Sequence, residues 1–217
     1  MPLATVFDLD ETLVDSSASW QRVLGTVAAR HGYAWTPADW AAIQGTSTAH
    51  WSTYLARRCR TVTAEAVVGE CVDGMVEAIR DGRVGLLPGA ADLVAAAAAR
   101  GPAGLVSASP RRYLDAAVTA FGLAALLRVT VAGEDVERGK PAPDPYLLAA
   151  RLLGVAPADC VAVEDSASGI RSAHAAGMTV LAIPNATTAL DFATLELAHH
   201  HAADARIAAK TLGILAG

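Results

Sequence analysis

Short apolar runs alternate with helix-like segments along most of this chain, and this alternation restricts the fold more than any other feature of the sequence. The runs have the length and the Val, Leu, Ile and Ala content of buried strands, and they lie at 4–7, 103–106, 129–132, 160–163 and 179–183. Pro or Ser residues begin, and Gly residues often end, the helix-like segments at 90–100, 111–121, 144–153 and 166–176. Strands connected in this way form right-handed crossovers. The sequence therefore predicts an α/β fold with a parallel sheet.

One long insertion interrupts this alternation between residues 15 and 85. It contains helix-like patterns throughout, at 20–31, 37–43, 48–59 and 64–80. We therefore predict two domains, an α/β core made of residues 1–14 and 86–217 and a helical cap made of residues 15–85.

Composition narrows the classes of partner and compartment. The chain has 217 residues, of which 53% are hydrophobic and 18% charged, and its net charge of −5 argues against nucleic acid as the main partner. No apolar run approaches the roughly 20 residues that span a bilayer, and the N-terminus shows no signal-peptide pattern. Cys59, Cys71 and Cys160 share no metal-ligand spacing, so we expect reduced thiols. We expect a cytoplasmic monomer or weak homodimer without a membrane partner.

Polar residues follow four of the apolar runs. Ligands of an open parallel sheet bind beyond the carboxyl ends of its strands, so these residues are expected to converge. They are Asp8 to Thr12, Ser107 to Ser109, Gly133 to Asp135 with Gly139 to Pro141, and Glu164 to Ser166.

Asp8 and Asp10 are two residues apart, a spacing that places both side chains on one face of a straight strand, and a bend after Asp8 would also let both carboxylates face one substrate. Converging carboxylates repel each other unless a cation neutralises them, and oxygen ligands favour Mg²⁺. Lys140, one of only two lysines in the chain, could offset the repulsion between a carboxylate nucleophile and a phosphate. Ser107 and the backbone amides after it could hold phosphate oxygens.

Four segments resemble, in order and spacing, the motifs of the haloacid dehalogenase superfamily of phosphatases, and the match covers nearly the whole chain. The superfamily implies a Rossmann-like parallel-sheet core with an inserted helical cap, and Leu87-Pro88-Gly89 is similar to the segment that returns from that cap. The four segments are Phe7 to Ser16, Val106 to Ser109, Gly139 to Pro145 and Val163 to Ile170.

The resemblance implies a role for each acidic residue. Asp8 would be the nucleophile that forms an aspartyl-phosphate. Asp10 would protonate the leaving alkoxide and later deprotonate water, while its backbone carbonyl binds Mg²⁺. Asp8 and Asp165 would ligate the metal through their side chains, with Glu164 as a further ligand or as a support beside it. The Asp at position 10 favours phosphatases over true dehalogenases, which lack it.

The resemblance also implies which residues bind the phosphate. Ser107, Ala108, Lys140 and Thr12 would contact it, and Thr12 would also fix the turn that aims Asp10. Glu11 departs from the family pattern, in which Gly is commoner, and we expect its side chain to face solvent or the cap.

The cap loop between two predicted helices resembles the specificity loop of the family. Gly45, Thr46, Ser47 and His50 are therefore predicted to read the substrate, although His50 could equally be a surface residue. Arg57, Arg58 and Arg60 are interpreted as a solvated helix face rather than a site for an anionic substrate tail.

Other polar and aromatic residues have simpler interpretations. Ser109, Ser166 and Ser168 are expected to cap helices. Trp20, Trp35, Trp40 and Trp51 are expected to pack the cap, with at most one or two of them facing the substrate. The tract from His199 to His201 is expected on a solvated helix face or turn.

Three functions remain open at this point. The first is Mg²⁺-dependent hydrolysis of a small phosphate monoester such as phosphoglycolate or a sugar phosphate. The second is phosphoryl transfer between sugar hydroxyls, as in a β-phosphoglucomutase, which would use the same core residues. The third, a phospho-accepting signalling domain of the response-regulator type, is disfavoured by the DxD spacing and by the cap.

Overall fold

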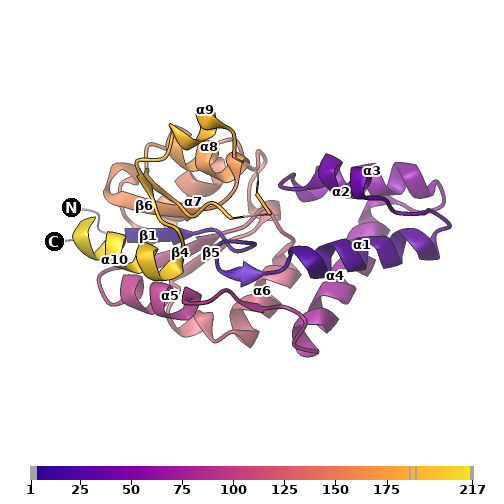
Figure 1. Cartoon of the computed structure of the whole chain (residues 1–217), viewed down its shortest axis with the longest axis horizontal. Coiled ribbons are helices and arrows are strands. Elements are labelled where there is room, and N and C mark those ends of the chain that lie inside the picture. Colours follow the sequence, from indigo (N-terminus) through magenta and orange to yellow (C-terminus); the bar gives the residue numbers. More distant parts are fainter. Residues whose placement is uncertain (1–3, 186, 189, 216–217) are drawn as a thin grey trace.

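A six-stranded parallel sheet forms the centre of the molecule (Figure 1). The computed structural model describes residues 4–185, 187–188 and 190–215. The strand order is β5-β4-β1-β6-β7-β8, which places β1 beside β4 and β6 in the middle of the sheet. The five predicted strands are all present. The strands are β1 (Ala4–Phe7), β4 (Ala103–Val106), β5 (Val129–Val131), β6 (Cys160–Glu164), β7 (Thr179–Ala182) and β8 (His200–His201).

Helices cover both faces of this sheet. On one face lie α7 (Asp144–Leu153) and α8 (Ala167–Ala175), and on the other lie α5 (Ala90–Ala98), α6 (Arg111–Ala120) and α10 (Ala205–Leu215). Side chains alternate along β1, so that Val6 packs with one layer and Phe7 with the other. Both faces are therefore buried, which explains why the strands read as continuous apolar runs. The remaining short elements are α9 (Phe192–Leu195) and 3₁₀ turns at Leu123–Ala125, Gly133–Asp135 and Pro157–Asp159.

The insertion forms the four predicted helices. They are α1 (Ser17–Arg30), α2 (Pro37–Ile43), α3 (Thr48–Cys59) and α4 (Ala64–Arg80), and Figure 1 shows them to one side of the sheet. A two-stranded antiparallel ladder of β2 (Val14–Asp15) and β3 (Gly85–Leu86) connects them to the sheet. The sequence analysis missed this ladder because two residues per strand are too few to show a periodic pattern. The ladder lies at the predicted boundary of the cap, whose status as a separate domain stays a prediction.

One apolar cluster runs from the insertion into the sheet. It joins Leu55 of α3 and Met75 of α4 to Phe7 of β1 and Leu105 of β4, and α4 also packs against α6. Packing therefore holds the insertion against the sheet, in addition to the β2–β3 ladder. No helix among the described residues has both the length and the apolar character needed to cross a bilayer.

The prediction for the histidine tract was wrong. His200 and His201 form the edge strand β8, paired in parallel with Leu181 and Ala182. His199 is anchored as well, because its Nδ1 accepts a hydrogen bond of 3.0 Å from the backbone N–H of Val180. A two-residue strand has no periodicity of its own, so only the neighbouring β7 defines it.

A buried carboxylate organises the first turn of α2. Asp39 accepts hydrogen bonds from the hydroxyls of Thr36 (2.6 Å), Tyr54 (2.7 Å) and Tyr33 (2.9 Å), and Thr36 caps the helix. Burial raises the pKa of Asp39, but these hydrogen bonds outweigh it and hold the pKa at about 2, below 3.8. Arg58 lies over the Tyr54 ring beside this cluster, so it serves the packing of the cap.

We predict that Asp39→Asn destabilises the protein by about 2 kcal/mol at pH 7, which is the free energy equivalent of the lowered pKa. Since the folded pKa lies below the unfolded one, this stabilisation is present above pH 3.8 and is lost as the pH falls toward 2. Urea unfolding of both proteins at several pH values should show the difference shrinking to about half by pH 3. Exposed Asp81→Asn is the control, and a difference that stays constant with pH would contradict the assignment.

Candidate active site

A pocket of about 140 Å³ lies between the carboxyl ends of the central strands and the helical insertion. The sheet side contributes Asp8 after β1, Ser107 after β4, and Asp165 after β6, together with Lys140. The insertion supplies the opposite wall from α1, α2 and α3. The predicted convergence of polar residues is present for three of the four segments and for Lys140 of the fourth, whereas Gly133 to Asp135 do not line the pocket.

The chain bends directly after Asp8. The backbone amides of Leu13 and Val14 both donate to the carbonyl of Leu9, at 2.9 and 3.0 Å, and Glu11 has a positive φ of 64°. This tight turn follows the end of β1, and Asp8 and Asp10 line the same pocket. A bend after Asp8 is therefore present, as the sequence analysis considered.

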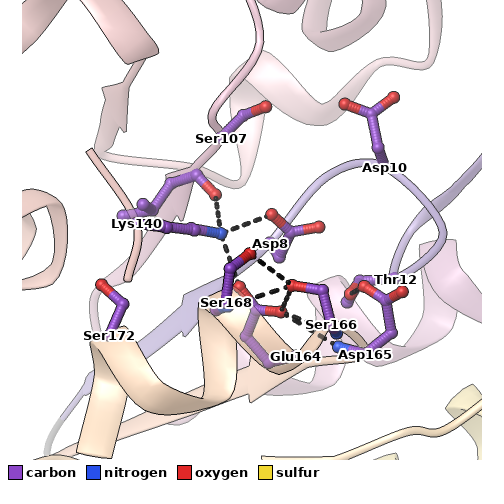
Figure 2. Close-up of polar contacts among 12 residues, drawn as sticks. Asp8, Asp10, Thr12, Ser107, Lys140, Glu164, Asp165, Ser166, Ser168 and Ser172 are labelled. Carbon is purple, nitrogen blue, oxygen red and sulfur yellow. Dashed lines mark hydrogen bonds and ion pairs between the residues drawn. The ribbon is translucent and has the colours of Figure 1, made fainter. Parts of the chain in front are cut away.

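Lys140 connects two carboxylates at the floor of the pocket (Figure 2). Its Nζ donates to Asp8 Oδ1 at 2.6 Å, to Glu164 Oε1, and to the carbonyl of Val106 at 3.3 Å. The side chain is only 4% exposed. Burial lowers the pKa of Lys140, but the charges of Asp8 and Glu164 outweigh it and raise the pKa above the usual 10.5. Lys140 is therefore held as a cation beside Asp8.

Glu164 is completely buried and fully hydrogen-bonded. Besides Lys140, its Oε1 accepts from the hydroxyl of Tyr146 at 2.8 Å. Its Oε2 accepts from the backbone amides of Asp165 and Ser166, and from the Ser166 hydroxyl, at 3.0 to 3.1 Å. Gly169 packs against this carboxylate, and a Cβ there would overlap it. These contacts favour a role for Glu164 in supporting Lys140 over direct ligation of a metal ion.

Asp165 is oriented by two side chains. The buried hydroxyl of Thr12 donates to its Oδ1 at 2.7 Å, and Asn185 Nδ2 donates to its Oδ2 at 3.3 Å. Thr12 is not among the pocket-lining residues, so the structure does not bring it to the predicted phosphate site. The sequence analysis missed Asn185, although it follows β7 as the other polar residues follow their strands.

Three carboxylates meet where a cation is expected. Oxygens of Asp8, Glu164 and Asp165 lie within 4.8 Å of one another, and among the described residues Lys140 is the cation that pairs with Asp8 and Glu164. Burial raises the pKa of Asp8 from 3.8 to about 8 despite the lowering effect of Lys140, and burial with the charges of Asp8 and Glu164 raises that of Asp165. A divalent cation would balance the two excess negative charges, and all-oxygen donors suit Mg²⁺. The residues therefore fit the predicted magnesium ion.

The Asp10 carboxylate is separate from this acidic group, and Figure 2 shows it directed away from Lys140 and Glu164. Its Oδ1 accepts from Ser16 at 2.7 Å, from Tyr113 at 2.8 Å and from Trp20 Nε1 at 3.3 Å, and its Oδ2 accepts from Ser109 at 2.7 Å. Ser109 was predicted to cap a helix, and that prediction was wrong. Metal binding through the backbone carbonyl of Asp10 stays a prediction.

Direct contacts close the insertion over the phosphate side of the pocket. Ser107 and Ala108 both line the pocket, and the Ser107 hydroxyl accepts from the amide of Ser109 at 3.0 Å. Thr48 at the start of α3 donates to the carbonyl of Ala108 at 3.0 Å. Ser168, also predicted as a helix cap, instead donates to the carbonyl of Gly45 at 3.1 Å, whereas Ser166 does cap α8.

Only half of the predicted specificity loop reaches the pocket. Gly45 and Thr46 line it, together with the unpredicted Gln44. Ser47 instead caps α3, accepting from the amide of His50 at 3.3 Å, and the His50 side chain is exposed outside the pocket.

Aromatic residues contribute more to the pocket than predicted. Trp20, Trp40 and Trp51 all line it, whereas the expectation was one or two tryptophans. Trp20 packs edge to face on Tyr113, with ring centroids 5.1 Å apart, which fixes the indole that donates to Asp10.

Glu11 faces the cap, which is one of the two placements expected for its side chain. Its Oε1 accepts from the amides of Ser16 and Ser17 at the start of α1, at 2.9 and 2.8 Å. Its Oε2 accepts from the hydroxyl of Thr187 at 2.9 Å. Glu11 thus stabilises the N-terminus of the first cap helix.

Comparisons with known proteins agree with this geometry. A family model described as haloacid dehalogenase-like hydrolase matches residues 3–177. Hexitol phosphatase A of Escherichia coli (strain K12) is 38% identical over 82% of this chain and 81% of its own length, and protein CbbY of Rhodobacter capsulatus is 44% identical over 52% of each chain. The crystal structure of CbbY from Rhodobacter sphaeroides in complex with phosphate covers 94% of this chain and 95% of its own, with 26% identity and a TM-score of 0.84.

We predict that Gly169→Ala destabilises the protein by about 3 kcal/mol, because the added methyl group would displace the buried Glu164 carboxylate from Lys140. Urea unfolding would measure the loss. Gly69→Ala, in a helix position with open space around it, is the control and should be neutral or slightly stabilising. Equal stabilities of the two variants would show that the site tolerates movement of Glu164.

Proposed function

This chain belongs to the haloacid dehalogenase-like hydrolase family, and from that premise we propose that it hydrolyses a small phosphate monoester through an aspartyl-phosphate on Asp8, with Mg²⁺ as cofactor. The observation that carries the proposal is the pairing of buried Asp8 with Lys140 at 2.6 Å, in the pocket that Asp10 also lines. This reaction needs a carboxylate nucleophile, a fixed cation beside it, and a second carboxylate that is held by a different set of hydrogen bonds.

In the first step an oxygen of Asp8 attacks phosphorus. Oδ1 is held by Lys140, while Oδ2 accepts no hydrogen bond from the described residues and is available as the nucleophile. The Oδ2–P bond forms and the P–O bond to the organic group breaks. A proton from the Asp10 carboxyl group neutralises the leaving alkoxide. Ser16, Ser109 and Tyr113 hold Asp10 in position for this transfer.

In the second step water cleaves the aspartyl-phosphate. Asp10 accepts a proton from the attacking water, the Oδ2–P bond of Asp8 breaks, and inorganic phosphate leaves. Ser107 and the backbone amide of Ala108 would hold the phosphoryl oxygens throughout, since the amide of Ser109 already donates to the Ser107 hydroxyl. Both carboxyl groups then return to their starting protonation states.

The magnesium ion would be held by the side chains of Asp8 and Asp165 and by the backbone carbonyl of Asp10. When bound, it would neutralise negative charge on the phosphoryl group and on the carboxylates. Thr12 and Asn185 orient Asp165 for this purpose.

Phosphoryl transfer between sugar hydroxyls uses the same core residues and is the second candidate. Hydrolysis is favoured by the similarity to hexitol phosphatase A, which extends over most of both chains. A signalling domain is disfavoured because the helical insertion covers the acidic site.

We predict that Asp8→Asn lowers kcat for p-nitrophenyl phosphate by about a thousandfold or more, because the amide is a poor nucleophile. Steady-state assays with Mg²⁺ would measure the loss, and near-ultraviolet circular dichroism would confirm that the variant is folded. Excess EDTA should abolish the activity of the unmodified protein, and added Mg²⁺ should restore it. Robust turnover by a folded Asn variant would rule out the aspartyl-phosphate.

Asp10→Asn tests the acid role separately. An alkyl phosphate has a poor leaving group that needs a proton, whereas p-nitrophenolate leaves without one. We predict that this variant loses about tenfold more kcat/KM on sorbitol 6-phosphate than on p-nitrophenyl phosphate. Equal losses on the two substrates would remove Asp10 from the acid role.

A further inference from the structure

The cap wall of the pocket is apolar and aromatic. Helices α1, α2 and α3 each contribute a tryptophan, namely Trp20, Trp40 and Trp51. Leu24 of α1 and Ile43 of α2 also line the pocket. The polar groups that the cap adds are all uncharged, and they belong to Ser16, Ser17, Gln44, Gly45 and Thr46.

Positive charge is scarce in this pocket. Among the described residues that line it, Lys140 is the only basic one, and its ammonium group already contacts Asp8 and Glu164. The arginines of the cap lie elsewhere, with Arg58 over the Tyr54 ring and Arg57 and Arg60 outside the lining. Glu11 adds a further negative charge on the cap side of the pocket.

This distribution has opposite consequences for the two ends of a substrate. The phosphoryl group is matched at the sheet edge by Lys140, by the amide of Ala108 and by the metal site. A second anionic group at the other end would lie against indole rings without a cation, near Glu11, and would lose its hydration. Carbon–hydrogen faces of an uncharged chain or ring can pack on the indoles. Substrate hydroxyls can donate to the side-chain oxygens of Gln44 and Thr46, since Gln44 Nε2 already donates to the carbonyl of Thr187 and the Thr46 hydroxyl to that of Ile43.

The size of the pocket sets a further limit. One enclosed water needs about 10–15 Å³, so 140 Å³ accommodates on the order of ten water-sized groups. This space suits a phosphoryl group with a short organic chain.

We propose that the substrate is a monophosphate ester of a small uncharged polyol or sugar, and that the cap wall selects against substrates with a second anionic group. This inference rests on the phosphatase function proposed above. It also separates hydrolase from mutase, because transfer of a phosphoryl group to a second hydroxyl of a sugar monophosphate passes through a bisphosphate. The cap offers such a bisphosphate no second cation.

A matched pair of substrates tests the charge rule. Sorbitol 6-phosphate and 6-phosphogluconate have the same chain length and phosphate position, but the far end is a hydroxymethyl group in one and a carboxylate in the other. At a fixed concentration of free Mg²⁺, we expect kcat/KM to be about tenfold or more higher for sorbitol 6-phosphate. Fructose 6-phosphate should exceed fructose 1,6-bisphosphate in the same way.

A charge added to the cap wall supplies the reciprocal test. Gln44→Arg places a cation in the pocket lining, and it should reduce the preference for sorbitol 6-phosphate over 6-phosphogluconate about threefold or more. Ala42→Arg adds the same charge to an exposed position of α2 outside the lining, and it should leave the preference unchanged.

The outcomes separate this inference from the function on which it rests. Suppose that the protein hydrolyses p-nitrophenyl phosphate but that kcat/KM is equal or higher for 6-phosphogluconate and fructose 1,6-bisphosphate, the substrates with a second anionic group. This result would overturn the charge rule and leave the phosphatase function in place. An unchanged preference in a folded Gln44→Arg variant would overturn the assignment of selectivity to the cap wall. Absence of p-nitrophenyl phosphate hydrolysis by the unmodified protein would overturn both proposals.

Discussion

The contact of Lys140 with Asp8 and Glu164 is the interaction on which the rest of the site depends. It brings together side chains from three distant parts of the chain, and it places a fixed cation beside the proposed nucleophile. Glu164 can hold Lys140 because Tyr146, Ser166 and two backbone amides satisfy its remaining lone pairs. A buried charge cluster of this kind is stable only when every member is paired, and the excess negative charge that remains is what a divalent metal ion would neutralise.

The helical insertion completes this site and gives it selectivity. The sheet edge holds the charged groups, whereas the insertion contributes a neutral, aromatic wall. Trp20 links the insertion to the sheet edge, because its ring lines the pocket and its Nε1 donates to Asp10. Contacts through Thr48 and Ser168 also hold the insertion against the sheet edge beside the pocket.

Sequence reasoning succeeded where one short segment carries its own signal. The buried strands, the four cap helices and the polar residues after the strands were all predicted, because strand hydrophobicity and helix punctuation are local. It was wrong for Ser109, for Ser168 and for the placement of Ser47, whereas the exposed His50 matches one of the two placements considered. It missed Asn185, although its position after β7 was a usable signal, and it missed the strand β8 because two residues leave no periodic pattern.

The sequence by itself determined the fold class and the residues that can react, because strand ends in a parallel sheet converge whatever the details of packing. Only the tertiary structure decided which side chain supports which. Thr12 orients Asp165 from 153 positions away in the sequence, and Tyr113 holds Asp10 from 103 positions away. Such pairs depend on how helices and strands pack in three dimensions. That packing is a collective property of the whole core, and no short stretch of sequence encodes it.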